Sequence, residues 1–277
     1  MHSLKRSSRQ QVLSYRDGEL IELTLPAATT RVFGHQLRWG RAEEIGTPAY
    51  WTAQAWMWEA EDPDHYRLGR TLREEMLACL LGGYGIPAEV GLAAYDRLRA
   101  APADALEDEH SVLEMLTTPL EVKGRPVRYR FARQKAHHVA LCVAGLADID
   151  TDAGDRDLRD ALVGLSGIGP KTASWIVRNW RDSDEVSILD IHIIRACHSL
   201  GLFDSAWRVE RHYAQMEAAY LAFAKAVGAR ASILDSVIWM TMRQLPQDIV
   251  ANLNQKDARI QKNKTSKAVD IRQSVLI

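Results

Sequence analysis

The chain has 277 residues, of which 47% are hydrophobic and 26% charged, and its formal net charge is −1 at pH 7. These proportions are those of a folded globular protein and argue against long disordered or fibrous segments. The apolar runs are too short for a membrane-spanning helix, and no apolar signal core follows the basic start. We therefore expect a cytoplasmic protein of one large domain or two packed domains, with no membrane as a partner.

The three cysteines, Cys79, Cys142 and Cys197, lie far apart in the sequence. Their odd number and wide spacing argue against a disulfide framework and fit a reducing compartment. They also exclude a site that needs four cysteines of one chain, such as a structural zinc site or an iron–sulfur cluster. The sequence thus indicates neither a metal site nor a cofactor.

The near-zero net charge hides two segregated stretches. Six basic and no acidic residues fall within 123–135, whereas six aspartates and two arginines fall within 148–160. A basic stretch suits an anionic polymer, although a solvated charged surface explains most such runs.

The first 65 residues contain the expected β structure. Residues 1–16 are polar and basic, and we expect a loose arm there. Segments 19–25 and 31–39 carry alternating apolar residues and predict two short strands within an N-terminal element, 17–65. Thr47-Pro48 is typical of a helix start, here the start of a tryptophan-rich helix.

The rest of the chain has helical periodicity up to about residue 250. A helix is expected at 66–81, and Gly82-Gly83-Tyr84-Gly85 ends it. Further helices are expected at 87–100, 103–116, 131–147, 156–165, 170–180, 191–201, 207–226 and 232–244. We therefore predict a mainly α chain with a helical domain at 66–250, followed by a polar basic tail, 251–277, that is frayed or disordered.

The most informative segment is a helix, a glycine turn and a second helix, within 156–180. Gly167 and Gly169 permit a tight turn, and Pro170 suits the first position of the next helix. The free N–H groups at such a helix start favour an anion, and glycines let a DNA phosphate come close. An ordinary helix–turn–helix connection is the alternative, and the two glycines alone do not exclude it.

Two residues near this turn carry candidate chemistry. Lys171 is at the second position of the new helix, and Asp190 follows an apolar extended stretch within the loop 186–192. Taken singly, Lys171 reads as a solvated lysine and Asp190 as a helix N-cap.

Taken together, Leu165–Lys171 and Leu189–His192 resemble the signature of the helix-hairpin-helix, glycine/proline-rich-loop, aspartate (HhH-GPD) superfamily of DNA glycosylases. Ser166 stands where the superfamily usually has proline. The spacing from lysine to aspartate is similar to that of the 8-oxoguanine glycosylase/lyase branch. The resemblance implies the HhH-GPD fold, in which two helical subdomains flank a DNA-binding cleft, with a small N-terminal β element.

The resemblance also implies a mechanism. Lys171 would attack C1′ of the deoxyribose, expel the base and form a Schiff base, after which β-elimination could cut the strand. Since the attacking amine must be neutral, a partly buried helix start is a favourable place for it. Asp190 would stabilise the positive charge on the sugar and help to move protons.

Other residues are assigned to DNA by the same resemblance. His192 matches a position that contacts phosphate, and a surface histidine is an equally good interpretation. Tyr129-Arg130 resembles a wedge that fills the gap left by the flipped base. Tyr84 lies where the family inserts an asparagine-rich plug, but the asparagines are absent here, which puts the preference for the opposite base in doubt.

Two tryptophans are candidates for the base pocket. Trp175 lies one turn after Lys171 on the same face, where the 8-oxoguanine branch has a smaller residue, so it could stack on the extruded base or belong to the core. Trp239 could form a second wall, although a core position is the favoured interpretation.

The absence of clustered cysteines and the presence of Lys171 narrow the choice among the branches of the superfamily. Endonuclease III and the adenine glycosylases usually carry four clustered cysteines, and alkyl-base glycosylases usually lack the lysine. We therefore expect a monomeric DNA N-glycosylase/AP lyase of base excision repair that removes an oxidised purine, 8-oxoguanine above all, from duplex DNA; in a prokaryote it would associate with the nucleoid. Two alternatives stay open: removal of another modified base, such as a hypermodified base of foreign DNA, and DNA binding without catalysis.

Overall fold

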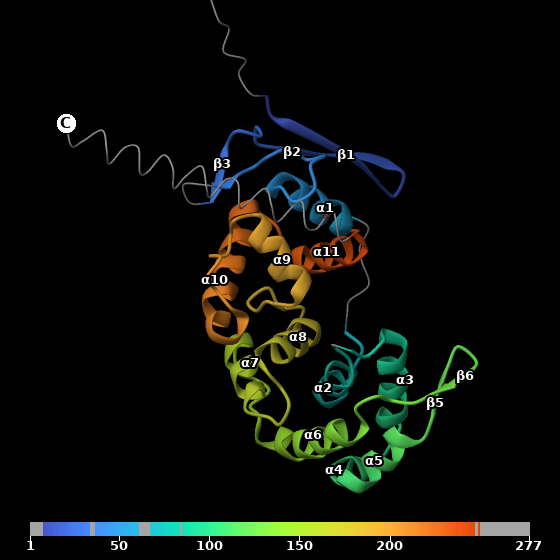
Figure 1. Ribbon diagram of the computed structural model, residues 1–277. Coiled ribbons are helices and arrows are strands. Elements are labelled where there is room, and N and C mark those ends of the chain that lie inside the picture. Colours follow the sequence, from blue (N-terminus) through green and yellow to red (C-terminus); the bar gives the residue numbers. More distant parts are fainter. Residues whose placement is uncertain (1–7, 34–36, 61–66, 84, 247–248, 250–277) are drawn as a thin grey trace, which may run out of the picture. The chain divides into compact units, whose positions relative to one another are not determined.

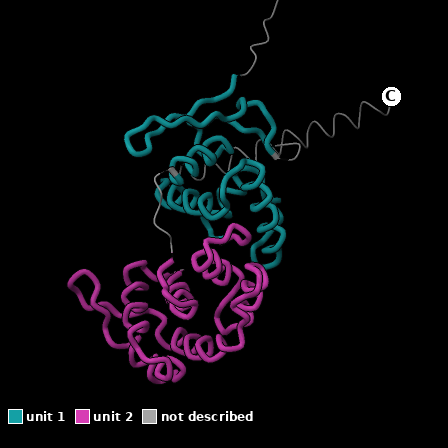
Figure 2. The backbone as a smooth tube through the Cα atoms, turned by 180° about the vertical axis from the view of Figure 1, so that it is seen from behind, with its two compact units in different colours: residues 1–63, 189–277 teal, residues 64–188 magenta. Residues whose placement is uncertain are grey.

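The computed structural model describes residues 8–33, 37–60, 67–83, 85–246 and 249 (Figure 1). The chain divides into two compact units (Figure 2). Unit 1 consists of residues 1–63 and 189–277, and unit 2 consists of residues 64–188. The helical stretch predicted as one domain, 66–250, is therefore divided between the two units, and the boundary falls just before Asp190.

Unit 1 begins with a β-hairpin that the sequence analysis did not foresee. Strand β1, Gln10–Arg16, pairs antiparallel with β2, Glu19–Leu25. Asp17 and Gly18 both have positive φ, as the central residues of a type I′ turn require. The prediction of a loose arm is wrong for residues 10–16, which form a strand with Val12 against the core of the unit and Leu13 and Tyr15 exposed.

The segment predicted as one strand, 31–39, is a second short hairpin. Its strands are β3, Arg31–Phe33, and β4, Leu37–Arg38. Helix α1, Pro48–Ala60, starts where predicted, because the hydroxyl of Thr47 accepts a hydrogen bond from the backbone N–H of Tyr50 at 3.1 Å.

Three helices complete unit 1: α9, Ile191–Ser199, α10, Val209–Val227, and α11, Ala231–Gln244. Helix α11 packs against α1, α9 and α10, so the core joins the two ends of the chain. Its largest fully buried side chains are Trp51, Phe203, Tyr220 and Phe223. The predicted tail, 251–277, lies outside the described residues.

Unit 2 is built from one continuous segment. Its helices are α2, Leu72–Leu81, α3, Ala88–Arg99, α4, Ala103–Glu107, α5, Glu109–Thr117, α6, Ala132–Gly145, α7, Asp155–Val163, and α8, Pro170–Arg181, with a 3₁₀ turn η1, Leu146–Asp148. Within the unit, α2 packs against α3, α6 and α8, and α7 packs against α8.

Two predicted helices differ from those observed in unit 2. Helix α2 begins at Leu72, because the Thr71 side chain caps it and the Glu75 carboxylate binds the N–H groups of two residues before the helix, 68 and 69. The helix predicted at 103–116 is two helices, because Asp108 ends α4 and caps α5 by accepting a hydrogen bond from Ser111 N at 2.8 Å.

A third hairpin, in unit 2, was not predicted. Strands β5, Leu120–Val122, and β6, Arg125–Val127, pair across Lys123-Gly124, which both have positive φ.

The three cysteines are buried thiols. Among the described residues, no helix combines the length and the apolar character needed to span a bilayer.

Candidate functional site

The glycine turn predicted between two helices is present in unit 2 and joins α7 to α8. Ile168 N donates to Leu165 O at 3.2 Å, which closes a four-residue turn. Gly167 is its third residue and has a φ of +74°, the value that a type II turn requires there and that favours glycine. The sequence prediction of a glycine hairpin over this segment is confirmed.

The start of α8 is open toward an anion. Gly169 is the N-cap and contributes no side-chain hydrogen bond, and the first helical bond runs from Ala173 N to Gly169 O. The N–H groups of Lys171 and Thr172 therefore have no acceptor within the helix. A Cβ placed on Gly169 would meet no atom within 4 Å, so a ligand could approach the backbone here.

Lys171 lies in this first turn of α8, and Trp175 follows one turn later. Both side chains are half-buried, and Trp175 packs against the core of unit 2. Its ring also borders the loop after α2, because a Cβ on Gly82 would lie 3.4 Å from Trp175 Cη2. The structure thus places one aromatic face beside the loop predicted to fill the duplex, with the candidate nucleophile on the same helix.

Asp190 is the N-cap of α9, in unit 1. Its Oδ1 accepts hydrogen bonds from His192 N at 2.8 Å and from Ile193 N at 2.9 Å. Both bonds use the same oxygen, and Oδ2 accepts none from the residues described. The N-cap interpretation of Asp190 is therefore confirmed, and one carboxylate oxygen remains for chemistry. The convergence of Asp190 with Lys171 depends on how the two units are arranged, and it stays a prediction.

The other residues predicted to contact DNA or the base lie in both units, and their roles stay predictions. His192 is half-buried in the first turn of α9, and Tyr84 lies outside the described residues. Arg130 is exposed, and its guanidinium lies 5.1 Å from the centre of the Phe131 ring. Trp239, for which a core position was favoured, is instead 40% exposed. The guanidinium carbon of Arg243 lies over its indole, 4.4 Å from the centre of the Trp239 ring.

The predicted wedge is wrong for Tyr129. Its side chain is 5% exposed, within the core of unit 2, and burial raises the pKa of its phenol. The hydroxyl donates to Leu81 O at 2.7 Å, and the neighbouring Lys135 Nζ donates to Leu80 O at 2.6 Å. Tyr129 and Lys135 thus bind the last carbonyls of α2 and fix the point where the loop at 82–86 begins.

Replacement of Tyr129 by phenylalanine tests this assignment. We expect the free energy of unfolding to fall by about 1 kcal/mol, because a buried hydrogen bond is lost. Opposite-base preference and DNA affinity should stay as in the unchanged protein, whereas Arg130→Ala should weaken binding without loss of stability. Full stability of the Tyr129→Phe protein together with an altered opposite-base preference would restore the wedge assignment for the hydroxyl.

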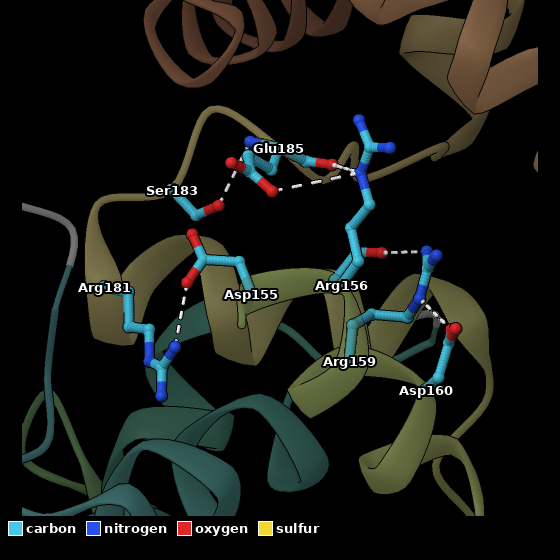
Figure 3. Close-up of polar contacts among 8 residues, drawn as sticks. Asp155, Arg156, Arg159, Asp160, Arg181, Ser183 and Glu185 are labelled. Carbon is cyan, nitrogen blue, oxygen red and sulfur yellow. Dashed lines mark hydrogen bonds and ion pairs between the residues drawn. The ribbon is translucent and has the colours of Figure 1, made fainter. Parts of the chain in front are cut away.

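Much of the segregated charge has structural partners. In the basic run, Lys123 pairs with Glu89 at 3.0 Å and Lys135 binds Leu80 O, while the arginines are exposed: Arg125, Arg128, Arg130 and Arg133. In the acidic run, Asp155 pairs with Arg181 of α8 at 2.9 Å (Figure 3). The ion pair of Asp155 thus connects the end of α8 to the start of α7. In the basic run, the exposed arginines are the candidate phosphate contacts.

No group of histidine, cysteine or acidic side chains suited to hold a metal ion occurs in the described part of the chain. The groups that the sequence analysis missed lie on α6, where His138 and Cys142 contact the glycine turn. Their spacing of four residues puts them on one helix face, which was the available signal.

A model of the 8-oxoguanine DNA glycosylase family (Ogg-HhH) matches residues 71–229, more than half of the chain. This range includes the glycine turn, Lys171 and Asp190. A search of curated proteins finds no match.

Solved structures provide further comparisons. The 8-oxoguanine DNA glycosylase of Methanocaldococcus jannaschii is 25% identical over 61% of this chain and 76% of its own, with a TM-score of 0.47. The corresponding enzyme of Thermotoga maritima is 23% identical over 61% and 77%, with a TM-score of 0.46. Endonuclease III, solved in a non-covalent complex with DNA, is 19% identical over 78% and 96%, with a TM-score of 0.51, which shows the fold. The fold is therefore the HhH-GPD glycosylase fold, and the chain belongs to the 8-oxoguanine DNA glycosylase (Ogg-HhH) family.

Proposed function

We propose that the protein is a bifunctional DNA glycosylase and AP lyase that excises an oxidised purine, 8-oxoguanine, from duplex DNA during base excision repair. The observation that carries the proposal is Lys171 in the first turn of α8, directly after a glycine turn with an open helix start, in a chain of this family. A glycosylase without lyase activity needs no amine at this place, whereas a lyase does.

The proposed reaction begins when a DNA phosphate binds the free N–H groups at the start of α8. With the strand held, the damaged nucleotide leaves the stack. The amine of Lys171 attacks C1′, so that a C–N bond to the enzyme forms, the glycosidic bond breaks and the electron pair leaves with the base, which takes up a proton. The nitrogen lone pair then breaks the C1′–O4′ bond, O4′ takes up a proton, and the iminium of the opened sugar loses its 2′ proton, so that β-elimination expels the 3′ phosphate.

Asp190 has an electrostatic part in this proposal. The carboxylate would stabilise the positive charge that develops on the sugar and would move protons during elimination. Because Oδ1 is fixed by two backbone N–H groups, the plane of the carboxylate is set before substrate binds. Oδ2 is then the oxygen that would face the reacting sugar.

Trp175 supports a purine as the extruded base. Its half-buried ring offers a flat surface one turn from Lys171, and stacking on such a ring suits a bicyclic base. We propose that Trp175 forms one wall of the base pocket and that Trp239, exposed on α11, forms a second. The large ring of Trp175 also favours the second candidate, another modified base, since it alters the shape of the pocket.

Duplex DNA that contains the modified base is the proposed partner, and the protein would act as a monomer in the cytoplasm, on the nucleoid in a prokaryote. The exposed arginines within 125–133 would contact phosphates around the lesion.

The decisive experiment measures release of free base from a panel of duplexes that carry single modified bases. The panel pairs 8-oxoguanine with each of the four bases and includes hypoxanthine, 3-methyladenine and glucosylated hydroxymethylcytosine. We expect 8-oxoguanine to be released roughly 10²-fold faster than any other base, followed by strand cleavage. Preference for another modified base would favour the second candidate, and salt-dependent binding without release of any base would contradict catalysis.

A further inference from the structure

Helix α6 presents a row of side chains to the glycine turn. His138 Nδ1 lies 2.9 Å from Ser166 Oγ, and the thiol of Cys142 donates to the carbonyl oxygen of Ser166 at 2.9 Å. Gly145 continues the row, because a Cβ there would lie 2.8 Å from Leu165 Cδ2 and leave no room for that side chain. Residues 138, 142 and 145 follow the spacing of one helix face, so the turn rests on α6 along its length.

The His138 ring lies directly against Gly167, the residue of the turn that has positive φ. A Cβ on Gly167 would lie 2.4 Å from His138 Cγ, closer than side chains approach in folded proteins. Burial, with added repulsion from Lys135 and His137, holds the pKa of His138 below its usual value, so its contact with Ser166 joins two neutral groups. The ring therefore supports Gly167 by packing and Ser166 by a hydrogen bond.

Ser166 occupies the second position of the four-residue turn, where proline is common because its ring fixes φ. A serine leaves this φ free, and one backbone bond, from Ile168 N to Leu165 O, closes the turn. The conformation of the N–H groups before α8 thus depends on contacts from outside the turn. His138 and Cys142 supply these contacts, and both act on Ser166.

We propose that His138 is a positioning residue for DNA binding, which holds the Ser166-Gly167 turn in the shape that binds a backbone phosphate. The inference rests on the proposed phosphate-binding role of this turn. A turn that is already in its bound shape binds with less loss of conformational entropy, so removal of the support weakens binding. Because His138 does not touch the reacting atoms in this proposal, its loss acts on KM rather than on kcat.

The test compares His138→Ala, His138→Asn and Ser166→Ala in the full chain. Asparagine can place an oxygen near the position of Nδ1, whereas Ser166→Ala removes the hydrogen bond and leaves the ring in place. The matched control is His137→Ala, since His137 is exposed on the same helix and pairs with Glu109 at 2.8 Å. Binding is measured by fluorescence anisotropy with an undamaged duplex over a series of salt concentrations.

We expect His138→Ala and Ser166→Ala to raise Kd roughly three- to tenfold, because loss of the support weakens the charge-assisted bond from the backbone N–H groups to the phosphate. The slope of log K against log salt should stay nearly unchanged, because a backbone N–H carries no net charge and its weakened contact releases no fewer counterions. His138→Asn should recover part of the affinity, and His137→Ala should bind like the unchanged protein. Single-turnover base release at saturating DNA should be equal for all variants, which should differ only in the DNA concentration that gives the half-maximal rate.

Two results would overturn the proposal. One is an unchanged Kd in folded Ser166→Ala and His138→Ala, and the other is an equal loss of affinity in His137→Ala. Thermal unfolding of each variant identifies those that fail to fold, and Ser166→Ala, which creates the smallest change, then decides the question. Because undamaged DNA is used, the binding result is independent of which base the enzyme releases, so a failed lesion panel and a failed role of His138 remain distinguishable.

Discussion

Replacement of Lys171 by glutamine is expected to abolish the covalent protein–DNA complex that borohydride traps and to slow base release roughly 10³-fold or more. Only an amine forms the iminium that borohydride reduces, and glutamine has none. The change keeps a long polar side chain in the first turn of α8, where Lys171 is half-buried, so the fold should persist. Trapping is measured by gel shift on the best substrate of the lesion panel.

The matched control for this experiment is Lys225→Gln, which removes an exposed lysine from the last turn of α10. It should trap DNA as well as the unchanged protein does. Equal trapping by Lys171→Gln would show that another amine is the nucleophile. Loss of trapping with normal base release would instead assign Lys171 to the lyase step alone.

Replacement of Asp190 by asparagine should separate the two functions of this residue. Asparagine is as good an N-cap as aspartate, so its side-chain oxygen can keep the bonds to His192 N and Ile193 N. The charge is lost, and we expect base release at saturating DNA to fall about 10²- to 10⁴-fold. The midpoint of thermal unfolding should hardly change.

Asp190→Ala is the comparison for that variant, because it removes both the charge and the cap. It should lose a similar factor in rate and, in addition, about 1 kcal/mol of stability. If Asp190→Asn released base at the normal rate, the carboxylate would have a capping role only. A rate that followed stability across the two variants would lead to the same conclusion.

Local sequence rules predicted the centre of the candidate site well. Gly167, with its positive φ, and Pro170, at the first position of α8, have conformational reasons for their place, so the turn and the helix start followed from residue types, whereas Gly169 is an N-cap in extended backbone that other residues also adopt. The cap at Asp190 followed in the same way. These features depend on neighbours within four residues, which the sequence displays directly.

Features that depend on distant neighbours were missed. Tyr129 resembled an exposed wedge, but its hydroxyl binds Leu81 O, 48 residues away, and no local pattern shows that bond. The helix over 131–147 was predicted. The contact of its His138 with Ser166, 28 residues away, could not be predicted from the local pattern. The strand at 10–16 was missed because its apolar residues do not share one face: Val12 faces the core, whereas Leu13 and Tyr15 are exposed.

Unit 1 takes its core from both ends of the chain, and unit 2 is a continuous insertion between them. Loop-closure entropy favours early folding of unit 2, because its contacts lie within one continuous segment. Once unit 2 is folded, a shorter loop has to close when α1 packs against α11. Trp51, buried in α1, therefore contributes to the same core as α9, the helix that Asp190 caps. Removal of α1 would thus unfold the surroundings of Asp190, although more than a hundred residues separate the two along the chain.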